Sequence, residues 1–431
     1  MELSDHLFRR EAGRMVAVLT RIFGVHNMAL AEDVVQDAFC RAMDVWPFQG
    51  VPDNPSAWLM ATAKRRAIDV LRREHTAQAF APALSAALDE DGADPSILDA
   101  CFETEAIVDD QLRMMFTCCH PRLPETSQVA LMLNVLCGFS VAEVAHAFVE
   151  THTAVEKRIV RAKHVLASLR HVFDVDIEAD VERRLPVVHR AIYLLFNHGY
   201  HGASPESAVR IELCQEAMRL IALLQVHPRM RTPATNALAA LCCLHAARLP
   251  GRLDDAGAVH PLGAQDRTLW DRAMIKDGLE LLDRSARGRM LTEYHVEAAI
   301  AAVHAEAPAL AATDWVRIVE LYDMLMAIRP SPVVALHRAI AIGERDGPEH
   351  GLAAIAAIER PDRLARYPFY SAALGELELR RGAANRAHTY FLDALSVARN
   401  ETERQFFRQR IETVLSVGNP TIASPLPSPD R

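Results

Sequence analysis

The chain has 431 residues, of which 50% are hydrophobic and only 6% aromatic, and its net charge is −9. At about 150 residues per domain this length predicts two to four domains, and the composition suits a mostly helical protein. No run approaches the roughly 20 apolar residues that span a bilayer, and the N-terminus lacks the pattern of a signal peptide. The acidic balance argues against a chain that coats nucleic acid along its whole length.

The cysteines favour a reducing compartment. None of the eight forms a Cys-x-x-Cys pair, and most lie within helical patterns (Cys40, Cys101, Cys118, Cys119, Cys137, Cys214, Cys242 and Cys243). Such a distribution indicates free thiols rather than a disulfide framework. We therefore expect a cytoplasmic protein without membrane contact.

Three helices are predicted before residue 75. The first covers residues 3–23 and is closed by Gly24. The second covers residues 31–46, and its buried side is expected to hold Val34, Val35, Ala38, Ala42 and Trp46 or Val45. After a proline-containing loop, Asn54-Pro55 is a strong start signal, with Asn as the N-cap and Pro at the first helical position. A third helix is expected over residues 56–73.

The third helix has two dissimilar faces. At 100° per residue, its apolar side holds Met60, Ala63, Ala67, Val70 and Leu71. The opposite side gathers Trp58, Thr62, Arg65, Arg66, Asp69, Arg72 and Arg73. A Trp among arginines can stack on an unpaired base while the cations hold the backbone. The alternative is a Trp that packs under the proline-containing loop, and the pattern leaves both open.

Charge is distributed unevenly over the first 171 residues. Residues 1–75 hold ten basic and ten acidic side chains, and residues 111–171 hold seven basic and four acidic ones, a balance of +3. Between them, residues 76–110 carry nine acids and neither Lys nor Arg. This predicts an acidic, solvated connector between two domains that each carry a basic helix face.

A helix-turn-helix is predicted after a helix over residues 124–136 that ends at Gly138. Ser140-Val141-Ala142-Glu143 and Thr153-Ala154-Val155-Glu156 both match a capping box, in which two side chains satisfy free backbone donors at a helix start. The first helix would bury Val141, Val144, Ala145, Phe148 and Val149. Glu150, Thr151 and His152 leave room only for a tight turn.

The second helix of this motif is amphipathic with a basic outer face. Val155, Ile159, Ala162 and Leu166 fall on one side, and Lys157, Arg158, Arg161 and His164 on the other. A basic helix that follows a short helix and a tight turn can enter a DNA major groove. An ordinary helical hairpin with a solvated basic face has the same pattern, so the spacing alone does not decide.

Several segments together resemble bacterial RNA polymerase sigma factors of the extracytoplasmic-function type. Residues 31–39 (AEDVVQDAF) are similar to the helix of that family that binds the polymerase clamp, and residues 57–73 (AWLMATAKRRAIDVLRR) to its promoter-melting helix. Residues 123–140, 143–145 and 158–163 resemble its second DNA-binding domain. The family usually has Asn where this chain has Arg65, which puts base specificity at that position in doubt.

The remaining sequence resembles the members with a large tetratricopeptide-like C-terminal extension. The segments Asp110–Arg113, Phe116–Pro121 and Tyr193–Tyr200 carry this likeness. Leu374, Gly375, Gly382, Ala387, Phe391 and Ala394 also have the spacing of a helical repeat, and Gly347 precedes Gly382 by 35 residues, near the ~34-residue period of such repeats. The resemblance implies an all-α chain with sigma domains at 1–75 and 111–172, an acidic flexible linker at 76–110 and a regulatory extension at 173–431.

The resemblance also implies which residues act. Polymerase would be bound by Asp33, Gln36, Asp37 and Phe39. The −10 element would be opened and held by Trp58, Thr62, Lys64, Arg65, Arg66, Asp69, Arg72 and Arg73. The −35 major groove would receive Thr153, Glu156, Lys157, Arg158 and Arg161, where Glu156 could accept from cytosine and Lys157 or Arg161 could donate to guanine.

The implied partners are the β′ clamp and β flap of core polymerase, promoter DNA, and a protein or small-molecule partner of the C-terminal repeats. No cofactor, metal or catalytic residue is expected. We hypothesise that the extension sets activity in place of a separate anti-sigma factor, because it is longer than both sigma domains combined. A helix-turn-helix regulator that binds duplex operators without polymerase is the competing function, although it gives Trp58 no role.

An enzyme is a third alternative. Cys118-Cys119-His120, or His189, His198 and His201, could be taken for metal ligands. Adjacent cysteines lack the usual Cys-x₂₋₄-Cys spacing, however, and no acidic partner is fixed by the sequence. Core or surface histidines explain the pattern better.

Overall fold

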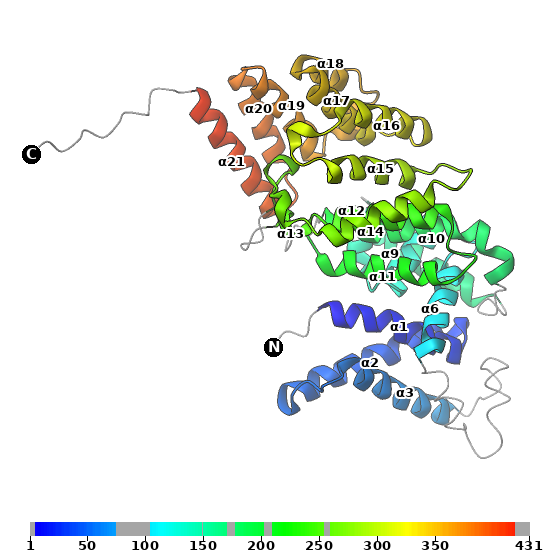
Figure 1. Cartoon of the computed structure of the whole chain (residues 1–431). Coiled ribbons are helices and arrows are strands. Elements are labelled where there is room, and N and C mark those ends of the chain that lie inside the picture. The colour runs from blue at the N-terminus through cyan, green and yellow to red at the C-terminus, as the bar shows by residue number, and fades with distance from the viewer. Residues whose placement is uncertain are drawn as a thin grey trace, which may run out of the picture. The chain divides into compact units, whose positions relative to one another are not determined.

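The computed structural model describes residues 5–74, 104–148, 150–169, 177–201, 209–253 and 259–418. Within these ranges the regular structure is helical, apart from an isolated antiparallel bridge between Leu253 and Val259. The all-α prediction is confirmed. The chain divides into two compact units, the first formed by residues 1–198 and 212–231 and the second by residues 199–211 and 232–431. Figure 1 shows the helices of both units.

Unit 1 begins with the three predicted helices. They are α1 (Asp5–Phe23), α2 (Met28–Gln49) and α3 (Pro55–Glu74), with a short 3₁₀ turn, η1 (Val25–Asn27), between α1 and α2. The Asn54 side chain accepts from the Ala57 amide at 3.0 Å, which confirms the predicted helix start. The α2 helix continues through Pro47, which the sequence had placed in a loop, and ends where Gly50 adopts a φ of +84°.

One face of α3 differs in detail from the prediction. Ala63 and Ala67 are buried as expected, but the third fully buried residue is Leu59. Met60 and Val70 are only half-buried. Because Leu59, Ala63 and Ala67 are spaced by four, the centre of the buried stripe lies roughly 30° from its predicted position at 100° per residue.

The second half of unit 1 contains α6 (Thr104–Cys118), α7 (Glu125–Val135), α8 (Val141–Phe148) and α9 (His152–Ala167). Helix α6 starts at Thr104, so its first seven residues lie within the segment predicted as a linker. Its Asp110 carboxylate is buried and lies 3.1 Å from Arg21 of α1, so this acid belongs to a packed helix and not to a solvated connector. Residues 76–103 of the predicted connector lie outside the described ranges.

The first predicted capping box is confirmed and the second is wrong. The Ser140 amide donates to the Glu143 carboxylate at 2.9 Å, and the Glu143 amide donates to the Ser140 hydroxyl at 3.2 Å. Helix α9, in contrast, begins at His152 with Thr151 as its N-cap, whose hydroxyl accepts from Ala154 at 3.4 Å. Thr151 is extended and Thr153 is already helical, so the turn ends two residues earlier than the motif suggested.

Most of two further helices, α10 (Ile177–Tyr200) and α11 (Ile211–Val226), belongs to unit 1, although both lie within the segment predicted as an extension; residues 199–211 belong to unit 2. The Arg184 guanidinium of α10 donates to the Phe116 carbonyl at 2.9 Å, and Arg219 of α11 donates to the Gln111 side chain at 3.2 Å. Both acceptors belong to α6. The second half of the unit therefore depends on polar contacts from beyond residue 172.

Unit 2 is a succession of helical hairpins. Its helices are α12 (Pro233–Ala246), α13 (Leu249–Arg252), α14 (Arg272–Ser285), α15 (Glu293–Glu306), α16 (Trp315–Ile328), α17 (Pro332–Asp346), α18 (Pro348–Ala356), α19 (Pro368–Arg380), α20 (Ala384–Ser396) and α21 (Glu401–Gly418). From α15 onward, each helix packs against the next one in the chain. Short 3₁₀ turns lie in several connections, at Leu262–Ala264, Arg267–Leu269 (η4), Leu310–Ala312 and Pro361–Leu364.

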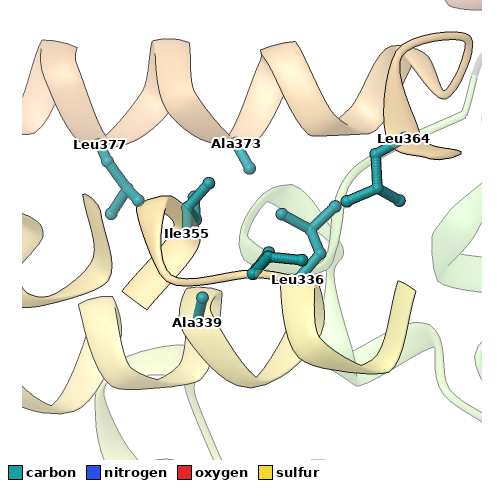
Figure 2. Close-up of a cluster of buried hydrophobic side chains, with 7 residues drawn as sticks. Leu336, Ala339, Ile355, Leu364, Ala373 and Leu377 are labelled. Carbon is teal, nitrogen blue, oxygen red and sulfur yellow. The ribbon is translucent and has the colours of Figure 1, made fainter. Parts of the chain in front are cut away.

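Small residues allow these hairpins to pack closely. A Cβ atom on Gly351 of α18 would lie 2.9 Å from the Gly343 Cα of α17, so only glycine fits this crossing. Beside it, α17, α18 and α19 share a core that includes Leu336, Ile355 and Leu377 (Figure 2). A Cβ atom on Gly375 would likewise lie 3.1 Å from the Phe391 ring, which explains the small residue that the repeat pattern indicated there.

Candidate nucleic-acid interface

Helix α2 presents the predicted polymerase-binding residues on its outer side. Asp33, Gln36 and Asp37 are exposed and Phe39 is half-buried. The opposite side of the helix buries Val34, Val35, Ala38, Ala42 and Trp46 as predicted. Because the buried side anchors the helix, the exposed carboxylates are held on a rigid element.

Helix α3 brings the predicted −10 residues to one exposed face. Arg65 and Asp69 are exposed, and Trp58, Thr62, Lys64 and Arg66 are half-buried. The side chains of Arg72 and Arg73 lie outside the described residues, although both positions are helical. The structure thus places six of the eight side chains along a single helix.

Trp58 is both part of the core and part of the surface. Its ring meets the buried Trp46 ring edge to face, with centroids 5.3 Å apart, while the residue as a whole remains half-buried. The packing partner is a Trp of α2 rather than the proline-containing loop. An aromatic ring that is fixed on one side and open on the other is suited to stacking.

Two predicted site residues bind each other. The Arg66 guanidinium donates to the Asp37 carboxylate at 2.7 Å, and the two side chains are 38% and 51% exposed. Such a surface pair adds little stability. It does, however, join α3 to α2, so the predicted DNA-binding face and the predicted polymerase-binding face meet at this contact.

Helix α9 has the predicted division between core and surface. Val155, Ile159, Ala162 and Leu166 are buried. Thr153, Glu156, Lys157 and Arg161 are all exposed, whereas Arg158 is half-buried and donates to Glu150 at 2.6 Å. Four of the five predicted −35 side chains are therefore available to a ligand, and Arg158 is held against the preceding turn.

Unit 1 contains a set of contacts that local sequence patterns did not indicate, because their partners are more than 100 residues apart. Lys163 of α9 lies 2.6 Å from the Glu32 carboxylate of α2, and Arg9 of α1 lies 3.0 Å from Glu143 of α8. A Cβ atom on Gly13 of α1 would lie only 2.1 Å from the Leu136 carbonyl oxygen. We call these the docking contacts; they hold the two groups of predicted DNA-binding residues in one compact body.

The buried thiols and imidazoles have the chemistry of core residues. Burial raises the pKa of Cys119 to about 12, with Arg184 opposing the shift, and burial lowers the pKa of His189 to about 4. At neutral pH both groups are therefore uncharged. Within the residues that the structure describes, no group of three or more His, Cys, Asp or Glu side chains could hold a metal ion. No described helix is both long and apolar enough to cross a membrane.

Comparison with known proteins identifies the first domain. Residues 7–76, which cover α1 to α3, match the family described as Sigma-70 region 2. This match supports a sigma-factor role in promoter recognition and in binding to RNA polymerase. Residues 184–286 match a family of unknown function, DUF6596.

Nearly the whole chain has a relative. It is 37% identical over 398 residues to an uncharacterized protein of Rhizobium meliloti (strain 1021), and the alignment covers 92% of each chain. The chain therefore belongs to one family with that protein, and its residues 7–76 match Sigma-70 region 2.

Proposed function

We propose that this chain is an alternative sigma factor of the extracytoplasmic-function type that carries a tetratricopeptide-like regulatory extension. It directs core polymerase to specific promoters and opens their −10 element. The observation that carries the proposal is helix α3, which bears Trp58 and the exposed Arg65 and is joined to the exposed Asp37 of α2 through Arg66, within a region 2 domain. In this proposal α2 binds the β′ clamp through Asp33, Gln36, Asp37 and Phe39.

The −10 element would be held by α3. Extruding a base costs a few kcal/mol, and stacking on an aromatic side chain returns about 1–3 kcal/mol. Trp58 supplies that surface, and the exposed Arg65 supplies a cation for the phosphates. Thr62, Lys64, Arg66, Asp69, Arg72 and Arg73 complete the proposed −10 surface.

The −35 element would be bound by α9. Glu156, Lys157 and Arg161 are exposed on the face opposite the buried residues, so they can reach base edges in the major groove together. Thr153 lies at the N-terminal end of this face, and we place Arg158 at its edge. The β flap is the proposed polymerase contact of this half of the unit.

The docking contacts bring the two surfaces too close to serve one promoter. The distance between Glu156 and Trp58 is bounded by a path along α9, α2 and α3 that crosses the Lys163–Glu32 and Asp37–Arg66 pairs. Helices rise about 1.5 Å per residue, and each pair of extended side chains adds about 12 Å. The distance is therefore at most about 55 Å. The −10 and −35 elements lie about 25 base pairs apart, or about 85 Å at about 3.4 Å per pair. We therefore infer that unit 1 opens before both elements are held.

We further propose that the C-terminal unit sets how readily unit 1 opens, in place of a separate anti-sigma factor. Support comes from α10 and α11, which follow the predicted helix-turn-helix domain in sequence and yet pack into unit 1 through Arg184 and Arg219. A conformational change in the helices that follow α11 could be transmitted to the docking contacts through Arg184 and Arg219.

Run-off transcription by core polymerase tests both proposals with one pair of proteins. The full chain is compared with a chain ending at Arg231, which retains all of unit 1. We expect transcripts from both, with yields that differ by severalfold because the extension biases opening. Equal yields at every promoter would refute the regulatory role, and no transcript from either chain would refute the sigma-factor role.

A further inference from the structure

Unit 2 contains arginines that lack the acidic partners found elsewhere in that unit. Arg380 pairs with Glu344 at 2.6 Å and Arg399 with Glu403 at 2.5 Å, and several exposed arginines are paired in the same way. Arg248, Arg252 and Arg267 differ. Among the residues described for unit 2, no carboxylate lies within ion-pair distance of any of these three guanidinium groups. We call them the arginine cluster.

The cluster lies in the connections that follow α12, with two members over an indole ring and the third over a phenol ring. Arg248 follows the end of α12, and Arg267 opens η4. Their guanidinium carbons lie 5.4 and 4.7 Å from the centre of the Trp270 ring. Arg252 closes α13, and its guanidinium lies 4.4 Å from the centre of the Tyr200 ring. Three cations thus share an aromatic site, although like charges repel one another.

Two of these cations are well buried. Arg248 is 7% exposed and Arg267 is 9% exposed. Arg267 is held in place because one of its nitrogens donates to the carbonyls of His304 and Ala307, at 2.6 and 2.5 Å, where α15 ends. Arg248 is oriented by Gln265, whose side-chain oxygen accepts from its Nε at 3.4 Å. These partners are neutral, so they fix the guanidinium groups without balancing their charge.

The acids on either side of Arg267 in the sequence are committed elsewhere, and those that follow Arg252 lie outside the described residues. The Asp266 carboxylate accepts from the amide and the hydroxyl of Thr268, at 2.8 and 2.6 Å. The Asp271 carboxylate caps α14 by accepting from the Met274 amide at 2.9 Å. Neither acid adjoining Arg267 in the sequence therefore neutralises the cluster.

The unbalanced charges shift the pKa values of groups in and beside the cluster. Burial lowers the pKa of Arg248, and Arg252 lowers it further, while Tyr200 opposes the shift. Burial, Arg248 and Arg267 together lower the pKa of His304 to about 3. The site is therefore a region of positive potential in which a further cation is disfavoured and an anion is favoured.

The cluster and its indole ring also carry unused donors. Arg267 Nη2, Arg252 Nε and Trp270 Nε1 are buried and have no hydrogen-bond partner among the described residues. Trp270 is only 2% exposed, so its N–H cannot be satisfied by bulk water. Buried polar groups are nearly always paired, and buried charges are compensated. A group that supplies acceptor oxygens and negative charge would provide partners for such donors.

We propose that unit 2 binds an oxyanion, the phosphate or carboxylate group of a ligand, at the arginine cluster. The planar guanidinium fork matches both groups, and its hydrogen bonds to them are charge-assisted. Arg252, which is half-buried, forms the accessible side of the site, and Arg248 and Arg267 form its floor. The proposal concerns unit 2 alone and does not depend on the sigma-factor role. It gives the C-terminal unit a ligand class.

Thermal unfolding and calorimetric titration of the full chain test this site. The probes are inorganic phosphate and malonate, each compared with sodium chloride at matched ionic strength. We expect phosphate, malonate or both to raise the unfolding temperature beyond the chloride control. A response to phosphate alone assigns a phosphorylated ligand, and a response to malonate alone assigns a carboxylate. No response beyond chloride to either probe overturns the proposal.

Variants locate the binding within the fold. Arg252→Gln should weaken binding of the effective anion at least about tenfold, because a charge-assisted contact is lost. Without anion it should unfold at the same temperature as the wild type or higher, because one repelling cation has gone. Arg380→Gln is the matched control, in which a paired arginine of the same unit is removed, and it should bind as the wild type does. Binding that survives in Arg252→Gln unchanged would overturn the site.

Discussion

Replacing Trp58 by alanine should reduce open-complex formation by about 5- to 150-fold. The reason is the loss of a stacking surface worth about 1–3 kcal/mol per unpaired base. Formation of heparin-resistant complexes between the reconstituted polymerase and promoter DNA measures this effect. Trp58→Phe keeps an aromatic face and should retain most of the activity.

The Trp58→Ala change also removes an edge contact with Trp46, which contributes about 0.5–1.5 kcal/mol to stability. A template whose −10 element is already unpaired separates the two effects. If Trp58 acts in strand opening, the premelted template should restore much of the lost activity, whereas a folding defect would persist on it. Wild-type opening by Trp58→Ala on duplex DNA would show that the ring serves the core alone.

Replacing Gly13 by alanine should open unit 1. In an isolated helix this substitution would stabilise the helix, because Gly is about 1 kcal/mol less favourable than Ala in a helix interior. Here the new Cβ would lie 2.1 Å from the Leu136 carbonyl oxygen, a backbone atom that cannot rotate away. Overpacking of this kind costs about 1–3 kcal/mol, which shifts the ratio of closed to open forms about 5- to 150-fold.

Small-angle scattering measures this opening through the radius of gyration, which should increase in Gly13→Ala. Binding to −35 DNA should strengthen at the same time, because α9 no longer lies against α2. Lys163→Gln is the milder comparison: it removes one half-exposed ion pair, worth about 0–1 kcal/mol, and should open the unit only slightly. An unchanged radius in Gly13→Ala would contradict the inference that the closed form must open.

Local rules predicted those parts of the fold that depend on near neighbours in sequence. The buried stripe of α9 follows from a spacing of three and four residues, and the start of α3 follows from Asn54 and Pro55. The same rules misplaced the start of α9, because Thr151 and Thr153 can both serve as caps and only the backbone conformation chooses between them.

The features that local patterns missed depend on residues far apart in the chain. The Lys163–Glu32 pair joins positions 131 residues apart, and the contact of Gly13 with Leu136 involves a backbone oxygen that no side-chain pattern reveals. Asp110 was counted as a solvated acid, yet it is buried beside Arg21. The arginine cluster could not be recognised in the sequence either, because its members are distinguished by having no acidic partner among the described residues of the folded unit.

The central claim is that α2 binds core polymerase, and a direct binding titration tests it. Fluorescently labelled full-length chain is titrated with purified core enzyme, and a variant with both Asp33→Ala and Gln36→Ala serves as the comparison, since both side chains are exposed and neither packs in the core. The account predicts saturable one-to-one binding by the wild type and at least tenfold weaker binding by the variant. Failure of the wild-type chain to associate with core polymerase would contradict it.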